Sequence, residues 1–98
     1  MKEGYFYIVA GRPDGILYCG STSNLGQRVE AHRHGVYGGF TKRYDVSRLV
    51  YYEHYGDIRE AIQRERHVKK WRRAWKVRLI LTHNPEWKDL AGEGYRGF

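Results

Sequence analysis

Two short segments rich in β-branched and aromatic residues lie near the start of the chain, at residues 4–9 and 16–20. The turn between them contains Arg12-Pro13-Asp14-Gly15, in which proline fixes one backbone dihedral and glycine accepts a positive one. These features predict a β-hairpin. A third segment, residues 48–55, contains Leu49-Val50-Tyr51-Tyr52 and predicts another strand.

A first helix is predicted between the hairpin and the third strand. Ser23 or Asn24 can cap its start, and Gly35 can close it. Four residues recur at the i, i+3, i+4 and i+7 spacing of one helical face: Leu25, Arg28, Val29 and His32. Residues 35–45, which contain glycine, threonine, Lys42 and Arg43, predict a loop.

The second half of the chain predicts two helices. Asp57-Ile58-Arg59-Glu60 has the form of a capping box, and the apolar stripe that follows comprises Ile58, Ala61, Ile62, Val68 and one of Trp71 and Trp75. A further helix over residues 72–82, ended by Asn84-Pro85, is expected to bury Trp75, Val77, Ile80 and Leu81. We expect one domain over residues 1–90 and a flexible, glycine-containing tail over residues 91–98.

The excess of positive charge is concentrated in one segment. The chain has 18 Lys and Arg against 11 Asp and Glu, and nine of the basic residues but only Glu60 and Glu65 of the acidic ones fall within residues 59–78. Together with nine Tyr, three Trp and three Phe, this stripe favours a polyphosphate partner such as nucleic acid. A solvated helix face is the alternative interpretation.

The location of the protein follows from what the sequence lacks. Cys19 is the single cysteine and cannot form an internal disulfide, and no charged leader precedes an apolar run. The apolar stretches fall far below the roughly 18 to 20 residues needed to cross a bilayer. We therefore expect a cytoplasmic protein with no membrane partner.

Several polar residues occupy faces that should be apolar. Arg28 and His32 share the stripe of the first helix, and a buried guanidinium needs an anionic partner unless its head stays in water. Glu65 lies three residues after Ile62 and three before Val68, so it falls on the inner face of its helix. It can either pair with Arg64, Arg66 or Lys69, or hold a hard metal ion through its oxygens.

Motifs along nearly the whole chain resemble the GIY-YIG nuclease superfamily, and in particular its small stand-alone bacterial members. They are, in order, Tyr5-Phe6-Tyr7, Tyr18-Cys19-Gly20, Leu25-Gly26-Gln27-Arg28 with His32, and Ala61-Ile62-Gln63-Arg64-Glu65 with Lys69. The resemblance implies an α/β protein of the α+β type, with a three-stranded antiparallel sheet flanked by helices. Cys19 is interpreted as a small core residue, and Ser21 stands where some relatives have lysine.

The resemblance also implies a catalytic set of Tyr7, Tyr18, Arg28, His32 and Glu65. Glu65 would hold one Mg²⁺ or Mn²⁺ ion, and Tyr18, or a water on the metal acting with it, would be the general base. Tyr7 would position the nucleophile or the scissile phosphate, and Arg28 would neutralise charge in the transition state. Because a phenol ordinarily titrates near pKa ~10, a tyrosine base needs positive charge close by.

The leading hypothesis is therefore a metal-dependent endonuclease that hydrolyses DNA, with structure-specific or single-strand-directed cleavage in repair or recombination as one role. The residues expected to contact nucleic acid are Lys42, Arg43, Arg66, Lys69, Lys70, Arg72, Arg73 and Lys76. The alternative is a catalytically weak or inactive nucleic-acid-binding module, and RNA stays open as a partner. A zinc site at Cys19, His32 and His34 is a third reading, for which no paired cysteine motif is present. The sequence leaves open a monomer or a weak dimer.

Overall fold

The computed structural model describes residues 2–34 and 46–91 of the chain. The predicted loop, with its nucleic-acid contacts Lys42 and Arg43, the closing Gly35, and residues 92–98 of the expected tail lie outside the described residues. Ala91, the first residue of that expected tail, is buried at 1% exposure. The packed part of the chain therefore extends at least to Ala91.

Three strands form one antiparallel sheet in the order β2-β1-β3. β1 comprises Gly4–Ala10, β2 comprises Leu17–Thr22, and β3 comprises Arg48–Tyr55, which matches the predicted third strand residue for residue. The central strand β1 is buried along its whole length, as expected for a strand with a neighbour on each side. The predicted α+β fold with a three-stranded antiparallel sheet is confirmed.

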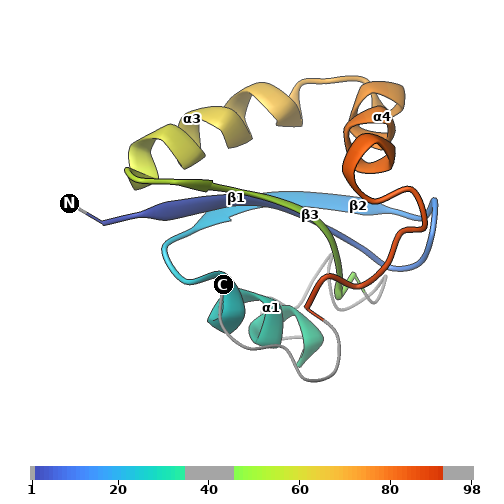
Figure 1. The fold of residues 1–98 in the computed structure, drawn as a ribbon, viewed down its shortest axis with the longest axis horizontal. Coiled ribbons are helices and arrows are strands. Elements are labelled where there is room, and N and C mark those ends of the chain that lie inside the picture. Colours follow the sequence, from blue (N-terminus) through green and yellow to red (C-terminus); the bar gives the residue numbers. More distant parts are fainter. Residues whose placement is uncertain (1, 35–45, 92–98) are drawn as a thin grey trace.

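The helices lie in two layers on opposite faces of this sheet (Figure 1). α1 (Leu25–Arg33) covers one face, and α3 (Ile58–Lys69) and α4 (Arg73–His83) lie over the other. Asn24, not Ser23, caps α1 by accepting a hydrogen bond from the backbone N–H of Gln27 at 3.0 Å. Asp57 caps α3 as predicted, since its carboxylate accepts from the backbone N–H of Arg59 at 2.9 Å.

Alternation along the strands divides the core into two clusters. Phe6 and Ile8 of β1 pack with Cys19, Val68 and Ile80 between the sheet and the layer of α3 and α4. On the other side, the intervening strand residues pack against α1 in a cluster that contains Tyr5, Tyr7, Val9, Leu25, Val29, Val46, Leu49 and Ala91, with Tyr18 half-buried against it. Side chains that follow one another on a strand therefore reach different helices.

The predicted buried face of α4 is wrong at two positions. Ile80 is fully buried and Val77 and Leu79 pack partly against the core, but Trp75 is 52% exposed and Leu81 is 42% exposed. Apolar residues occur all around this helix, so their spacing does not select a face. α4 turns its Ile80 side to the core and leaves Trp75 in solvent.

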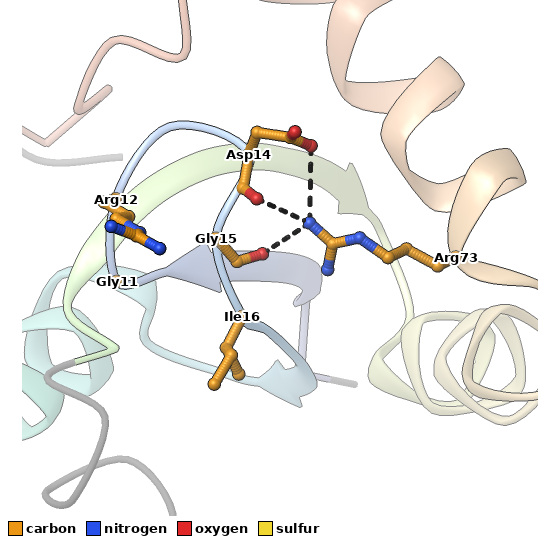
Figure 2. Close-up of a pocket in the computed structure, with 6 residues that line it drawn as sticks. All are labelled: Gly11, Arg12, Asp14, Gly15, Ile16 and Arg73. Carbon is orange, nitrogen blue, oxygen red and sulfur yellow. Dashed lines mark hydrogen bonds and ion pairs between the residues drawn. The ribbon is translucent and has the colours of Figure 1, made fainter.

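α4 is fixed at its start by the turn of the hairpin (Figure 2). The guanidinium of Arg73 donates to the carbonyl oxygens of Asp14 at 2.8 Å and Gly15 at 2.7 Å, and to the carboxylate of Asp14 at 3.4 Å. No side chain caps this helix, so the contact with the turn takes over the role of holding its first residue in place. Arg73 was expected to contact nucleic acid, and in the structure its guanidinium binds the hairpin turn.

A polar network joins α3 to β3. The carboxylate of Glu53 accepts hydrogen bonds from the hydroxyls of Tyr51 and Tyr55, and two from the guanidinium of Arg64 at 3.1 Å each. Burial opposes ionisation of Glu53, but these donors hold the pKa of its carboxyl below the usual range. The same interactions with Glu53, together with burial, raise the pKa of Tyr55 to about 12.

The chain after α4 crosses from the α3 and α4 layer to the α1 side of the sheet (Figure 1). Asn84 is 5% exposed, and its amide donates to the carbonyls of Val50 and Lys88 and accepts from the N–H of Lys88. Further on, Asp89 pairs with Arg33 of α1 at 2.8 Å. Asn84 is thus a structural residue. No helix among the described residues has the length and apolarity to cross a membrane.

Candidate active site

Four of the five predicted catalytic residues meet on the α1 face of the sheet. The hydroxyl of Tyr7 lies 3.0 Å from Nε2 of His32, and Nη1 of Arg28 donates to the same hydroxyl at 3.5 Å. The ring of Tyr18 lies 5.3 Å from the ring of His32, at an interplanar angle of 62°. Residues from two strands and one helix therefore converge on one imidazole.

The environment of His32 keeps its imidazole neutral. The side chain is 3% exposed, and burial together with the positive charge of Arg28 lowers the pKa of His32 from 6.5 to about 4. Nε2 of a neutral imidazole can accept a hydrogen bond from the hydroxyl of Tyr7. The oxygen of Tyr7 meanwhile accepts from Arg28, which has donors only, so the three groups form a consistent chain of hydrogen bonds.

Tyr7 is closed off from solvent at 0% exposure, and Gly20 makes room for it. The two residues are partners across β1 and β2, and a Cβ atom on Gly20 would lie 2.4 Å from the Tyr7 hydroxyl and 2.6 Å from Cζ. Only glycine leaves this space. In this structure the hydroxyl of Tyr7 contacts His32 and Arg28.

Glu65 reaches the same edge strand from the opposite face of the sheet. Its Oε1 accepts a hydrogen bond from the hydroxyl of Ser21 at 2.5 Å, and its Oε2 pairs with Nζ of Lys69 at 2.5 Å. Ser21 alternates with Gly20 on β2, so it faces the layer of α3 while Tyr18 faces α1. β2 therefore separates Glu65 from the side chains around His32.

The donor set of Glu65 suits a hard divalent ion. Its side chain is 19% exposed, which leaves the carboxylate accessible beside the hydroxyl of Ser21. Mg²⁺ sites often use one or two carboxylates and complete the shell with water and substrate phosphate. Within residues 2–34 and 46–91, no three His, Cys, Asp or Glu side chains gather as a metal site, so Glu65 would act as the single protein carboxylate.

A depression of about 280 Å³ lies beside this edge, and Leu17, Tyr18, Cys19, Lys69 and Lys76 line it. The half-buried phenol of Tyr18 and two ammonium groups thus share one opening to solvent. Cys19 is 6% exposed, and burial raises the pKa of its thiol, which fits the interpretation of a core residue. The depression offers positive charge where a phosphate would approach Tyr18.

The basic residues expected to contact nucleic acid divide into two groups. Lys69 pairs with Glu65, Lys76 donates to the carbonyl of Lys69 at 3.4 Å, and Arg73 holds the hairpin turn. Of the predicted contacts that lie in the described part of the chain, three are exposed and have no hydrogen-bond or ion-pair partner for the side chain: Arg66, Lys70 and Arg72. Arg64, an alternative partner for Glu65, pairs with Glu53 instead.

Two residues of the site were not assigned roles from the sequence, although each has a local signal. Ser21 follows Cys19 by two positions, so alternation places it on the face of the carboxylate helix. Gly20 is a glycine inside a strand pattern, which indicates that another group approaches the backbone closely. The local pattern does not identify the group that approaches Gly20, which in the structure is the ring of Tyr7.

Comparison with known proteins assigns the fold and the family. A family model described as the GIY-YIG catalytic domain matches residues 3–78, which include all five predicted catalytic residues. The chain belongs to the GIY-YIG family. Membership points to a nuclease-type activity on nucleic acid, and it leaves the particular reaction and metal open.

Relatives within the family are small proteins of similar length. A UPF0213 protein of Clostridium perfringens is 40% identical over 93% of this chain and 91% of its own length. One from Syntrophus aciditrophicus is 37% identical over 88% of this chain and 98% of its own length. The solution NMR structure of a UPF0213 protein from Bacillus halodurans, at 24% identity, covers 96% of this chain and 99% of that one with a TM-score of 0.56, which supports the fold.

Proposed function

We propose that this protein is a divalent-metal-dependent endonuclease that hydrolyses phosphodiester bonds in DNA, with cleavage centred on the outer edge of β2. The observation that carries the proposal is the gathering of Tyr7, Arg28 and His32 around one hydroxyl, with Tyr18 against the same imidazole. These groups come from positions far apart in the chain. The packing of a small sheet does not by itself require an arginine at position 28.

Arg28 supplies the positive charge for the reaction. Its guanidinium donates to the hydroxyl of Tyr7 at 3.5 Å, and in this proposal its charge acts on a phosphate at the edge of the site. A fixed positive group that faces the developing charge of a phosphoryl transition state costs no reorganisation during the reaction. Tyr7 and His32 act as positioning residues that keep this guanidinium in place.

Tyr18 is suited to handle the proton of the attacking water. It is the phenol that lines the depression beside β2, and Lys69 and Lys76 lie in the same lining. In this proposal Tyr18 accepts the proton of the attacking water as general base, and Lys69 and Lys76 bind the phosphate.

Glu65 is the residue that would hold the metal, with Ser21 orienting the carboxylate. A bound divalent ion would act as a Lewis acid on the scissile phosphate and neutralise its charge. Lys69 now pairs with the same carboxylate, which raises the pKa of the Lys69 ammonium through their hydrogen bond. Removing Lys69 should therefore strengthen the binding of a divalent ion to Glu65.

The pair of Glu65 and Lys69 also favours the second candidate, a nucleic-acid-binding module without catalysis. A carboxylate satisfied by a lysine and a serine needs no metal to explain its burial. Such a module would bind DNA or RNA with strong salt dependence and would yield no cleavage products. The two candidates differ in one measurable property, which is metal-dependent strand scission that requires Glu65.

The test compares Glu65→Gln with Glu60→Gln, which makes the same change of charge at an exposed position of the same helix. Labelled single-stranded, duplex and branched DNA and single-stranded RNA are incubated with Mg²⁺, with Mn²⁺ or with a chelator. We expect cleavage by the wild type and by Glu60→Gln, and none by Glu65→Gln or after chelation. Equal cleavage by wild type and Glu65→Gln would show that the activity is not this protein's.

A further inference from the structure

The exposed face of α4 carries an aromatic shelf that the proposed chemistry does not use. Trp75 is 52% exposed, and its ring stands 6.2 Å from that of Trp71 at an interplanar angle of 77°. These two rings, with Arg78, Leu79 and Thr82, line an open groove of about 370 Å³. A half-exposed indole beside a second ring offers an apolar surface on which another flat ring can pack.

The shelf is held in a fixed position by contacts already described. The guanidinium of Arg64 lies over the ring of Trp71, 5.0 Å from its centroid, and is itself fixed by Glu53. At the start of α4, Arg73 binds the hairpin turn. The two rings therefore form a preorganised surface, which reduces the entropy lost when a flat ligand packs on it.

The segment that carries the shelf contains charges of one sign. The sequence contains no Asp or Glu between Glu65 and Glu86. Arg72 and Arg78 are exposed at the two ends of the segment that contains Trp75, and within the described residues neither guanidinium has a hydrogen-bond or ion-pair partner. Glu53, the carboxylate beside Trp71, is paired with Arg64, so an aromatic platform flanked by arginines is left to match a base with its phosphates, since every base has a π face.

The shelf and the depression beside β2 share the helix α4, on faces that consecutive residues place about 100° apart. Lys76 follows Trp75 directly and lines the depression that contains Tyr18. A strand that lies along α4 can therefore place one nucleotide on the shelf while a neighbouring phosphate faces the edge of β2. We propose that Trp75 stacks with an unpaired base of the substrate strand and that Arg72 and Arg78 contact its phosphates.

This inference rests on the proposed function, and it specifies the substrate as a nucleic acid with a single-stranded segment beside the scissile bond. Bases in a duplex present only their edges, so a stacking platform on a helix surface selects unpaired nucleotides. DNA and RNA share this stacking chemistry, and the experiment separates them.

Binding is measured in the Glu65→Gln background, so that no substrate is cut. Fluorescence anisotropy gives the Kd for labelled oligothymidylate and oligouridylate of about 12 nucleotides and for a duplex of the same length. Trp75→Ala is compared with Trp75→Phe and with Leu81→Ala, which removes another exposed apolar side chain of α4 outside the groove. Circular dichroism and sedimentation of each variant report folding and oligomeric state.

We expect Trp75→Ala to weaken single-strand binding about 5- to 150-fold, the range of one base stacked on an aromatic ring. Trp75→Phe and Leu81→Ala should stay within about twofold, and the duplex should be affected less than the single strand. If Trp75→Ala does not fold, Arg78→Gln provides the test, because the loss of one phosphate contact should lower the salt slope on the single strand by about 0.7. A stronger effect on the uridylate than on the thymidylate would assign RNA.

Two results would overturn the inference: an unchanged Kd for Trp75→Ala, or an equal loss of affinity for Leu81→Ala. An unchanged Kd together with a loss of dimer mass in Trp75→Ala would mark a contact between copies of this chain. Glu65-dependent cleavage by the wild type could persist in each case, so the shelf can fail while the endonuclease proposal stands. Cleavage that does not require Glu65, with Trp75-dependent binding intact, would remove the endonuclease proposal and leave the shelf.

Discussion

Replacing His32 by glutamine should make the protein less sensitive to acid. The pKa of His32 is lowered to about 4 because burial and Arg28 disfavour the imidazolium. In the unfolded chain the same imidazole titrates at 6.5. Between these two pH values the unfolded state binds more protons than the folded state, so stability falls as the pH falls.

The size of the effect follows from the two pKa values. The difference between 6.5 and about 4, at about 1.36 kcal/mol per pKa unit, gives a loss of about 3 kcal/mol that is complete below the lower value. At pH 5 about 2 kcal/mol is already lost, and at pH 7.5 almost none. For a domain whose free energy of unfolding is about 5 to 15 kcal/mol, this is a large share.

Urea unfolding at pH 7.5 and pH 5, followed by circular dichroism, measures the effect as a change in the free energy of unfolding. The wild type should lose about 2 kcal/mol more than His32→Gln between these conditions, because carboxylates such as Glu53 contribute equally to both proteins. His67→Gln, at an exposed position of α3, is the control and should follow the wild type. Parallel pH dependence in wild type and His32→Gln would refute the reasoning.

Three other substitutions test the packing of the site. Gly20→Ala should destabilise the fold by about 1 to 3 kcal/mol in urea unfolding and displace the hydroxyl of Tyr7, whereas Gly56→Ala, where a Cβ atom meets nothing within 4 Å, should be neutral. Ser21→Ala should leave the free energy of unfolding nearly unchanged but weaken divalent-ion binding and cleavage by about 10- to 100-fold, because the carboxylate of Glu65 loses its orienting hydroxyl. Equal ion affinity of the variant and the wild type in titration calorimetry would contradict this. Asn84→Ala should cost at least about 2 kcal/mol, since it leaves buried carbonyl and N–H groups unpaired, and a thermal midpoint equal to that of the wild type would argue against its structural role.

Local patterns were reliable for the elements themselves. The hairpin turn, the third strand and the Asp57 cap depend on residues within a few positions of one another, so the sequence contains all the information they need. The motifs around Tyr7, Tyr18 and Glu65 likewise identified the family before any contact was known. Even the anomaly of His32 on an apolar stripe pointed to its burial.

The faces and partners of side chains depended on tertiary structure. The same spacing rules misplaced Trp75, because α4 has apolar residues on every side and only its neighbours choose which side is covered. Lys69 pairs with Glu65 because Arg64 is taken up by Glu53 of β3, which is distant in the sequence. The space for the Tyr7 ring exists because Gly20 of β2 lies opposite it. Periodicity and capping act over one or two helical turns, whereas burial and pairing are set by residues that meet only when the sheet and its two helical layers assemble.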